Sequence, residues 1–253
     1  MSDALLEAVQ VVARLAGDVA LSHYRTAIAV ESKGDGSPVT IADREAEQAA
    51  RDWIAQRFPA DGILGEEFGA RDGTSGRRWL LDPIDGTKSF VRGVPLWGTL
   101  IAVAEGDQVL AGAAYFPAVN EIIAAAPGEG CWWNGRRASV STVSTLASAT
   151  ALVTDDRAFA TIAQRDAWTA LADSAGVARS WGDCFGYLLV ATGRAEVMVD
   201  PIINPWDAAC FLPIIEEAGG VFTSLSGERT AFGGHAIATN RALGEAAREF
   251  FRD

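Results

Sequence analysis

"WLLDPIDGTKSF", residues 79–90, joins a run of apolar residues to two aspartates, Asp82 and Asp85, which are three positions apart. A proline follows the first aspartate and a glycine follows the second, and both residue types bend the chain. A simple turn needs only an Asp-Gly pair, so the second carboxylate and the hydroxyl of Thr87 indicate a further purpose. We expect the bend to direct both carboxylates towards one point, with the backbone carbonyl of Ile84 between them.

The residues before and after this stretch predict helices beside an antiparallel sheet. Apolar residues recur at helical intervals over residues 3–25 and 41–58, and the polar, Gly/Pro-containing residues 31–40 between them predict a loop. Strands are expected within 62–67 and 78–82, followed by a β-meander over 97–135 with turns at Gly106-Asp107, Pro117 and Gly128.

From about residue 148 the pattern changes to strands and helices in alternation, which favours an α/β half. We expect strands at 149–155, 195–200, 221–225 and 235–240, and helices at 161–175, 182–193 and 204–220 with a last helix at the C-terminus. The chain is therefore predicted to be an α+β half, residues 1–145, and an α/β half, residues 146–253, packed as one unit.

Composition narrows the class of protein. The net charge of -12 disfavours nucleic acid and anionic membranes as partners. No apolar stretch is long enough to span a bilayer and no secretion signal is evident, so we expect a cytoplasmic protein. The three cysteines are far apart and predict neither disulfides nor a thiolate zinc site. Clustered carboxylates can still recruit an anionic substrate if they first bind divalent cations.

Further acids stand where strands or helices are expected to end. Glu66 and Glu67 follow one strand, and Asp207 lies one turn into a helix that Pro205 begins. Convergence of these groups with Asp82 and Asp85 would give an oxygen-rich site of the kind that suits Mg²⁺.

Each piece also has a purely structural interpretation. Asp-Gly is a common turn, adjacent glutamates usually face solvent, and Asp207 can stabilise a helix N-terminus. Thr40 and Asp43 match a helix capping box. The combination and its order favour a catalytic site, although a non-catalytic metal-binding regulatory protein remains an alternative.

Two other kinds of hydrolytic site fit the sequence less well. The phosphatase loop of haloacid-dehalogenase type has its two aspartates two positions apart, whereas here they are three apart. No G-x-S-x-G motif occurs, and the only histidines, His23 and His235, have no matching serine and acid partners.

Several segments together resemble the inositol monophosphatase family of metal-dependent, lithium-sensitive phosphatases. They are "VTIADREAE" (39–47), "GEE" (65–67), "WLLDPIDGTKSF" (79–90), "NPWDAA" (204–209) and "EEAGG" (216–220). The resemblance implies a layered α/β/α/β/α fold, a homodimer, a small phosphorylated substrate and hydrolysis of a phosphomonoester.

The resemblance also implies two or three Mg²⁺ ions, with Mn²⁺ as a substitute. By this similarity the first ion would be held by Glu66, Asp82 and the Ile84 carbonyl, and the second by Asp82, Asp85 and Asp207. A third ion would share Glu66, assisted by Glu67 through water.

The family mechanism implied for this chain is in-line attack of a metal-bound water on phosphorus. Glu66 and Thr87 would position the water, Asp43 would hold the threonine hydroxyl, and the amides of Gly86 and Thr87 would receive phosphate oxygens. Lys33, in the loop before the second helix, would lie near the metal site.

Three segments resemble the histidinol-phosphate phosphatase branch of the family: "PLWGTLIAVA" (95–104), "WGDCFGY" (181–187) and "DPIINPWD" (200–207). This resemblance implies that Asp183 pairs with the cationic part of histidinol, with Asn204 adding a polar contact. The residues expected to contact substrate are Asp85, Gly86, Thr87, Asp183, Asn204 and Asp207. Asp183 can equally be a helix N-cap. Inositol 1-phosphate, or a broad range of sugar and nucleotide phosphates, is the alternative substrate.

Overall fold

The apolar periodicity at the start of the chain produces two long helices, α1 (Ser2–His23) and α2 (Ile41–Arg57). Buried residues of α1 such as Val9, Val12 and Ala16 recur every three or four positions and pack on a sheet. The capping box predicted at Thr40 and Asp43 is present and starts α2. Both expected helices are confirmed, with bounds that differ by one or two residues.

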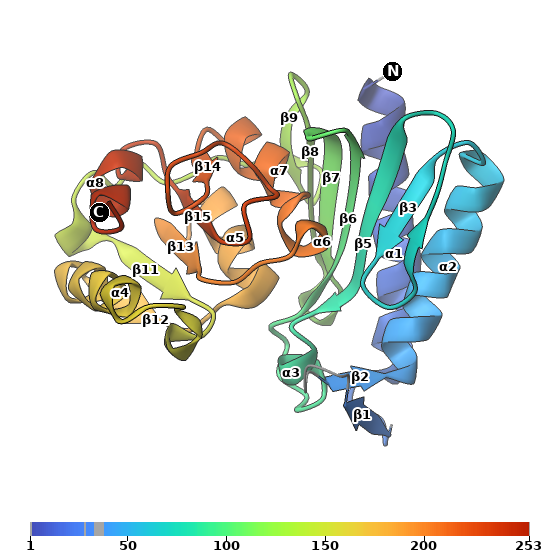
Figure 1. The fold of residues 1–253 in the computed structure, drawn as a ribbon, viewed down its shortest axis with the longest axis horizontal. Helices are drawn as coiled ribbons and strands as arrows, with labels where there is room; N and C mark the ends of the chain where they lie inside the picture. The colour runs from blue at the N-terminus through green and yellow to red at the C-terminus, as the bar shows by residue number, and fades with distance from the viewer. Residues whose placement is uncertain (1, 28, 33–37, 253) are drawn as a thin grey trace.

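The computed structural model describes residues 2–27, 29–32 and 38–252, and its layers follow the order α/β/α/β/α (Figure 1). Helices α1 and α2 cover one face of a large sheet. Helices α5 (Asp183–Ala191), α6 (Pro205–Ala208) and α7 (Phe211–Glu217) lie between that sheet and a smaller one. Helices α4 (Ile162–Ser174) and α8 (Gly244–Glu249) lie on the outer face of the smaller sheet. The expected layered fold is confirmed.

The large sheet has eight strands in the order β10-β9-β8-β7-β6-β5-β3-β4. Its strands are β3 (Gly62–Gly65), β4 (Gly69–Arg71), β5 (Arg77–Asp85), β6 (Gly98–Glu105), β7 (Gln108–Phe116), β8 (Glu121–Ala126), β9 (Gly130–Trp133) and β10 (Arg136–Arg137). The β-meander is confirmed, with η1 (Pro117–Val119) in one of its turns. The expectation of a wholly antiparallel sheet is wrong, because β4 turns to the outer edge and the chain then returns to pair β5 parallel to β3.

The smaller sheet has the order β12-β11-β13-β15-β14, in which β11 is parallel to β12 and β13. Its strands are β11 (Thr150–Val153), β12 (Val177–Arg179), β13 (Val197–Asp200), β14 (Val221–Thr223) and β15 (Ala236–Thr239). Strand β12 was not expected from the sequence. The chain passes from one sheet to the other between β10 and β11, and a division into two halves near residue 145 stays our proposal.

Short elements complete the chain. Strands β1 (Val30–Ser32) and β2 (Pro38–Thr40) pair with each other within the segment expected to be a loop. The remaining elements are α3 (Thr87–Phe90), η2 (Leu146–Ser148), η3 (Asp156–Ala158), α4 (Ile162–Ser174), α5 (Asp183–Ala191) and α8 (Gly244–Glu249).

The single helix expected over 204–220 is instead two helices, α6 (Pro205–Ala208) and α7 (Phe211–Glu217). Pro213 explains the break, because a proline inside a continuous helix removes a hydrogen bond and clashes with the preceding turn, whereas the first turn of a new helix accepts it. The junction packs closely on β7, where a Cβ at Gly112 would lie 2.5 Å from the carbonyl oxygen of Cys210.

Two further observations bear on the class of protein. Among the described helices, none has the length and apolar character needed to cross a membrane. The cysteines Cys131, Cys184 and Cys210 are free and buried.

Candidate active site

A β-bulge brings the two aspartates of the quoted stretch to the same side of the large sheet. Strand β5 continues through Asp82 to Asp85, where a loop had been expected. Asp82 pairs with Leu100 and Asp85 with Gly98, so three steps along β5 match two along β6. In a regular strand, residues three apart face opposite sides, and the extra residue of a bulge removes this difference.

The bulge is held by hydrogen bonds from both sides. The buried hydroxyl of Thr99 donates to the carbonyl of Pro83 at 2.7 Å, and the amide of Ile84 donates to Asp82 Oδ1 at 2.9 Å. Proline is tolerated at a bulge because no ladder hydrogen bond is required of its nitrogen.

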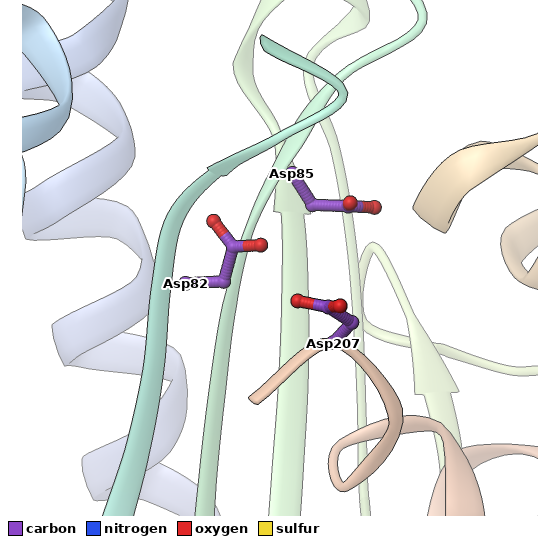
Figure 2. Close-up of side chains that lie close together, drawn as sticks. All are labelled: Asp82, Asp85 and Asp207. Carbon is purple, nitrogen blue, oxygen red and sulfur yellow. The ribbon is translucent and has the colours of Figure 1, made fainter. Parts of the chain in front are cut away.

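A third aspartate joins the pair from the middle helical layer. Asp207 is on α6, and ligand oxygens of Asp82, Asp85 and Asp207 all lie within 4.8 Å of one another (Figure 2). Asp207 also completes a capping box, because its Oδ2 accepts the amide of Asn204 at 2.9 Å and the side-chain amide of Asn204 at 3.2 Å. The structural and catalytic interpretations of Asp207 are therefore compatible.

Withdrawal from water raises the pKa of all three carboxyl groups. The pKa values of Asp82 and Asp85 lie well above the usual range, first because of burial and then because of negative neighbours, Glu66 beside Asp82 and Asp183 beside Asp85. Burial also raises the pKa of Asp207 to about 6. Three crowded carboxylates repel one another unless a cation lies between them, and hard oxygen ligands suit a divalent ion. These side chains fit a metal site.

The burial and crowding of these carboxyl groups predict how pH affects the free energy of unfolding of the metal-free protein. The pKa of Asp207 rises from 3.8 in the unfolded chain to about 6 when folded, so the folded state binds more protons between these values. The free energy of unfolding should therefore fall as pH rises through this interval. Thermal unfolding in chelator at about pH 4 and about pH 7 should show a larger loss for wild type than for Asp85→Asn, because the variant lacks the Asp85 carboxyl group whose pKa is raised on folding. Equal losses would contradict this raised pKa.

Glu66 lies at the edge of the three-aspartate cluster. It follows β3, and its amide donates to the carbonyl of Leu81 at 3.1 Å, beside Asp82. Its negative charge contributes to the raised pKa of Asp43, Asp82 and Asp207. Glu66 is therefore near enough to the aspartates for its charge to raise their pKa values.

The hydrogen bonds around Asp43 and Thr87 differ from the expectation. Asp43 is buried, and its Oδ2 accepts both the amide and the hydroxyl of Thr40 at 2.7 Å. The Thr87 hydroxyl donates to the Ile84 carbonyl at 3.0 Å. A hydroxyl has one proton to donate, so the expected donation from Thr87 to Asp43 is absent among these described residues. The Ile84 carbonyl keeps a second lone pair.

Gly86 allows the turn that presents the start of α3. It adopts φ 85°, and a Cβ there would lie 2.7 Å from the carbonyl oxygen of Leu96. The first helical hydrogen bonds run from Ser89 and Phe90 to the Gly86 carbonyl, so the Thr87 amide precedes them. The contribution expected of Lys33 lies outside the described residues.

A cavity of about 90 Å³ opens beside the aspartates. It is lined by Asp85, Thr154, Asp183, Cys184, Tyr187, Asp200, Ile202, Ile203 and Asp207. Asp183 is the first residue of α5, with φ 49°, and Gly182 stands at the N-cap position without a side-chain capping bond. The N-cap interpretation of Asp183 is therefore wrong. Burial raises the pKa of Asp183 to about 6, and the charge of Lys88 opposes this rise.

A buried network under Asp183 was not expected from the sequence. The Thr154 hydroxyl donates to Asp200, which also accepts the Tyr187 hydroxyl at 2.8 Å, and the Asp183 amide donates to Thr154 at 2.8 Å. Burial raises the pKa of Asp200 to about 7. In the sequence, Asp200 ends the apolar strand "VMVD" and begins the segment "DPIINPWD", but neither pattern indicated a role for its carboxylate. This network holds Asp183 in a left-handed backbone conformation that is unfavourable for most residues.

A roomier cavity of about 520 Å³ has none of Asp82, Asp85 and Asp207 in its lining, which includes Arg71, Arg77 and Arg78. Asp72 and Asp107 share that lining, and Arg77 is bonded to buried Asp61. Among the residues that the structure describes, crowded carboxylates that can ligate a metal meet only beside the smaller cavity, so we take this cavity as the candidate active site.

Known proteins resemble this chain over most of its length. The chain is 41% identical over 234 residues to the histidinol-phosphatase of Chlorobaculum parvum, covering 92% of this chain and 90% of that protein. It is 39% identical over 219 residues to the histidinol-phosphatase of Mycobacterium tuberculosis, covering 85% and 84%. The solved IMPase of Thermotoga maritima superposes with a TM-score of 0.87 at 30% identity, covering 98% of this chain and 96% of that one.

The sequence model of the inositol monophosphatase family matches residues 1–251, which is nearly the whole chain. Members of this family are metal-dependent phosphatases, and the acidic cluster can hold the metal that such chemistry needs. The chain is a phosphoric monoester hydrolase acting on a small phosphorylated substrate, and it belongs to the inositol monophosphatase family.

Proposed function

We propose that the protein is a Mg²⁺-dependent phosphatase that hydrolyses histidinol phosphate to histidinol and phosphate, a step of histidine biosynthesis. The observation that carries this proposal is the acidic Asp183, which lines the cavity beside Asp85 and Asp207. A substrate with a cationic tail fits such a cavity better than a neutral polyol does. The two histidinol-phosphatases that resemble this chain support the same substrate.

Three of the proposed metal ligands, Asp82, Asp85 and Asp207, have oxygens within 4.8 Å of one another, which supports a shared site. The first Mg²⁺ ion would be held by Glu66, Asp82 and the Ile84 carbonyl, and the second by Asp82, Asp85 and Asp207. Mn²⁺ would substitute for Mg²⁺. A third ion would use Glu66 with help from Glu67. When bound, Mg²⁺ neutralises phosphate charge, makes water more acidic and stabilises the departing alkoxide.

The remaining residues bind and orient the reactants. Glu66 and the Thr87 hydroxyl would hold the attacking water in line with phosphorus, and the amides of Gly86 and Thr87 would bind phosphate oxygens. Asp43 would lie beside Glu66, because it is buried at the start of α2 and its charge interacts with that of Glu66.

The leaving alcohol would lie against α5 and the start of α6. Asp183 would pair with the amino group or the imidazole of histidinol, and the exposed Asn204 would add a polar contact. The network from Tyr187 through Asp200 to Thr154 would keep the Asp183 carboxylate in place.

The alternative is an inositol-1-monophosphatase or a phosphatase of broad range. The likeness to the Thermotoga maritima IMPase favours it, because both chains share one fold over nearly their full lengths. A non-catalytic regulatory protein that only binds metal does not fit a chain that belongs to this family of phosphatases.

Phosphate release from histidinol phosphate and inositol 1-phosphate, measured in parallel with Mg²⁺, tests the proposal. We expect kcat/KM to favour histidinol phosphate by at least about a hundredfold, or about 3 kcal/mol of differential transition-state binding. A flat or reversed ratio would assign the substrate to a polyol or a broad range.

Assembly and location are also proposals. We propose a homodimer, which is the assembly implied by the resemblance to the inositol monophosphatase family. A cytoplasmic location is supported by three cysteines that remain free thiols.

A further inference from the structure

One face of α2 carries a charged residue at every fourth position: Asp43, Glu47 and Arg51. Asp43 lies at the site, whereas neither Glu47 nor Arg51 is among the residues assigned to metal or substrate. Glu47 is fully buried, which is rare for a glutamate unless its charge and its oxygens are satisfied. What it contacts therefore indicates its role.

Glu47 binds the turn between β3 and β4. Its Oε2 accepts the amide of Glu67 at 2.7 Å, and its Oε1 accepts the amide of Phe68 at 3.2 Å. Arg51 compensates the charge, because its Nε donates to Glu47 Oε1 at 2.7 Å. The same guanidinium donates from Nη2 to the Gly69 carbonyl, so the two side chains hold the turn at successive backbone groups.

The chain makes room for this carboxylate at Gly65. A Cβ on that residue would lie 2.0 Å from Glu47 Oε1 and 2.4 Å from Glu47 Cδ. No other residue type fits beside Glu47 in this position. The glycine of the "GEE" segment therefore allows Glu47 to reach the turn from α2.

The turn held in this way is the one that carries Glu66. Gly65 and Gly69 pair across β3 and β4, so Glu66, Glu67 and Phe68 form a three-residue connection. Glu66 begins this connection, and its amide is bonded to Leu81, the neighbour of Asp82. Glu66 is thus fixed by β5 on one side and by Glu47 on the other.

We propose that Glu47 is a positioning residue for metal binding, which clamps the turn so that the Glu66 carboxylate stays directed at the aspartate cluster. The inference rests on the proposed function, since it takes Glu66 to be a metal ligand. Residues that orient metal ligands commonly change metal affinity by about tenfold to a hundredfold when they are replaced. Glu47 acts through the backbone of the turn and touches neither metal nor substrate.

Binding of Mn²⁺ to the substrate-free protein, followed by electron paramagnetic resonance, tests this role apart from turnover. Glu47→Gln puts an amide where one carboxylate oxygen now accepts a backbone N–H, and we expect the dissociation constant for Mn²⁺ to rise at least about tenfold. The kcat at saturating metal should stay within about threefold of wild type. Glu45→Gln is the matched control, because Glu45 lies on the same helix but is exposed and bonded to His23. Unchanged affinity in Glu47→Gln would overturn the inference.

A double-mutant cycle with Glu66→Gln separates positioning from general stability. If Glu47 acts only through Glu66, adding Glu47→Gln to the Glu66→Gln protein should change metal affinity by less than about threefold. Fully additive losses would show that Glu47 acts by another route and would overturn the proposal. If Glu47→Gln fails to fold, Arg51→Lys provides the test. It keeps the positive charge but loses the guanidinium hydrogen bond to the Gly69 carbonyl, and it must still weaken metal binding. A wild-type protein that binds no Mn²⁺ would instead refute the proposed function.

Discussion

Replacing Asp85 with asparagine is expected to abolish phosphate release, with kcat/KM falling at least about a thousandfold, or about 4 kcal/mol. Asp85 is one of the three carboxylates that converge within 4.8 Å, and the change removes its charge while keeping its size. If the metal site is weakened, the negative charge of the phosphate is not neutralised and repels the attacking nucleophile. Initial rates over a range of Mg²⁺ concentrations measure the loss.

The same substitution should leave the fold intact. Asparagine retains an oxygen that can accept the Cys184 amide, as Asp85 does. It also removes one of the mutually repelling charges, so in chelator the melting temperature should equal or exceed that of wild type. Asp173→Asn, at an exposed position of α4, is the matched control and should be fully active. Substantial activity in Asp85→Asn would refute the assignment of the metal cluster.

Replacing Asp183 should affect one substrate far more than another. We expect Asp183→Asn to lower kcat/KM for histidinol phosphate by about a hundredfold and for p-nitrophenyl phosphate by less than about threefold. The generic ester has no cationic tail for the carboxylate to bind, so it reports only the metal chemistry. Steady-state kinetics of both esters with one enzyme preparation provide the comparison.

Asparagine is the cleaner substitution because Asp183 has φ 49°, a conformation that asparagine tolerates better than most residues do. Asp183→Ala removes the charge but also strains this backbone, so a loss shared by both substrates there can reflect a distorted α5. Equal losses in Asp183→Asn, however, would refute its role in specificity. Asp166→Asn, an exposed aspartate of α4, serves as control.

The sequence predicted that Asp82 and Asp85 converge, but it did not predict the β-bulge that brings them together. An apolar run followed by Asp-Pro-Ile-Asp-Gly reads as a strand that ends in a loop, because proline usually interrupts a sheet. The strand instead continues through a bulge, which depends on pairing with β6 and on the Thr99 hydroxyl. Such long-range contacts leave no periodic signal in the strand itself.

Other differences between the expected and the observed structure also arise from contacts between distant segments. The apolar periodicity over residues 204–220 suits one helix, and only Pro213 indicated the break between α6 and α7. The partner of Thr87 and the left-handed conformation of Asp183 depend on contacts between segments far apart in sequence. Asp200 escaped attention because a single acid at a strand end carries no motif. Local signals such as the capping box at Thr40 were predicted well, since all their partners lie within three residues.

Four of the acids of the site share one feature: each accepts a main-chain amide with a single oxygen. Asp43, Asp82, Asp85 and Asp207 accept the amides of Thr40, Ile84, Cys184 and Asn204 respectively. The scaffold therefore requires an oxygen at each of these positions, whereas the chemistry requires a charge. Amide variants at these positions should be inert proteins of native shape that still admit substrate, which makes them suitable traps for capturing the intact phosphate ester in a crystal.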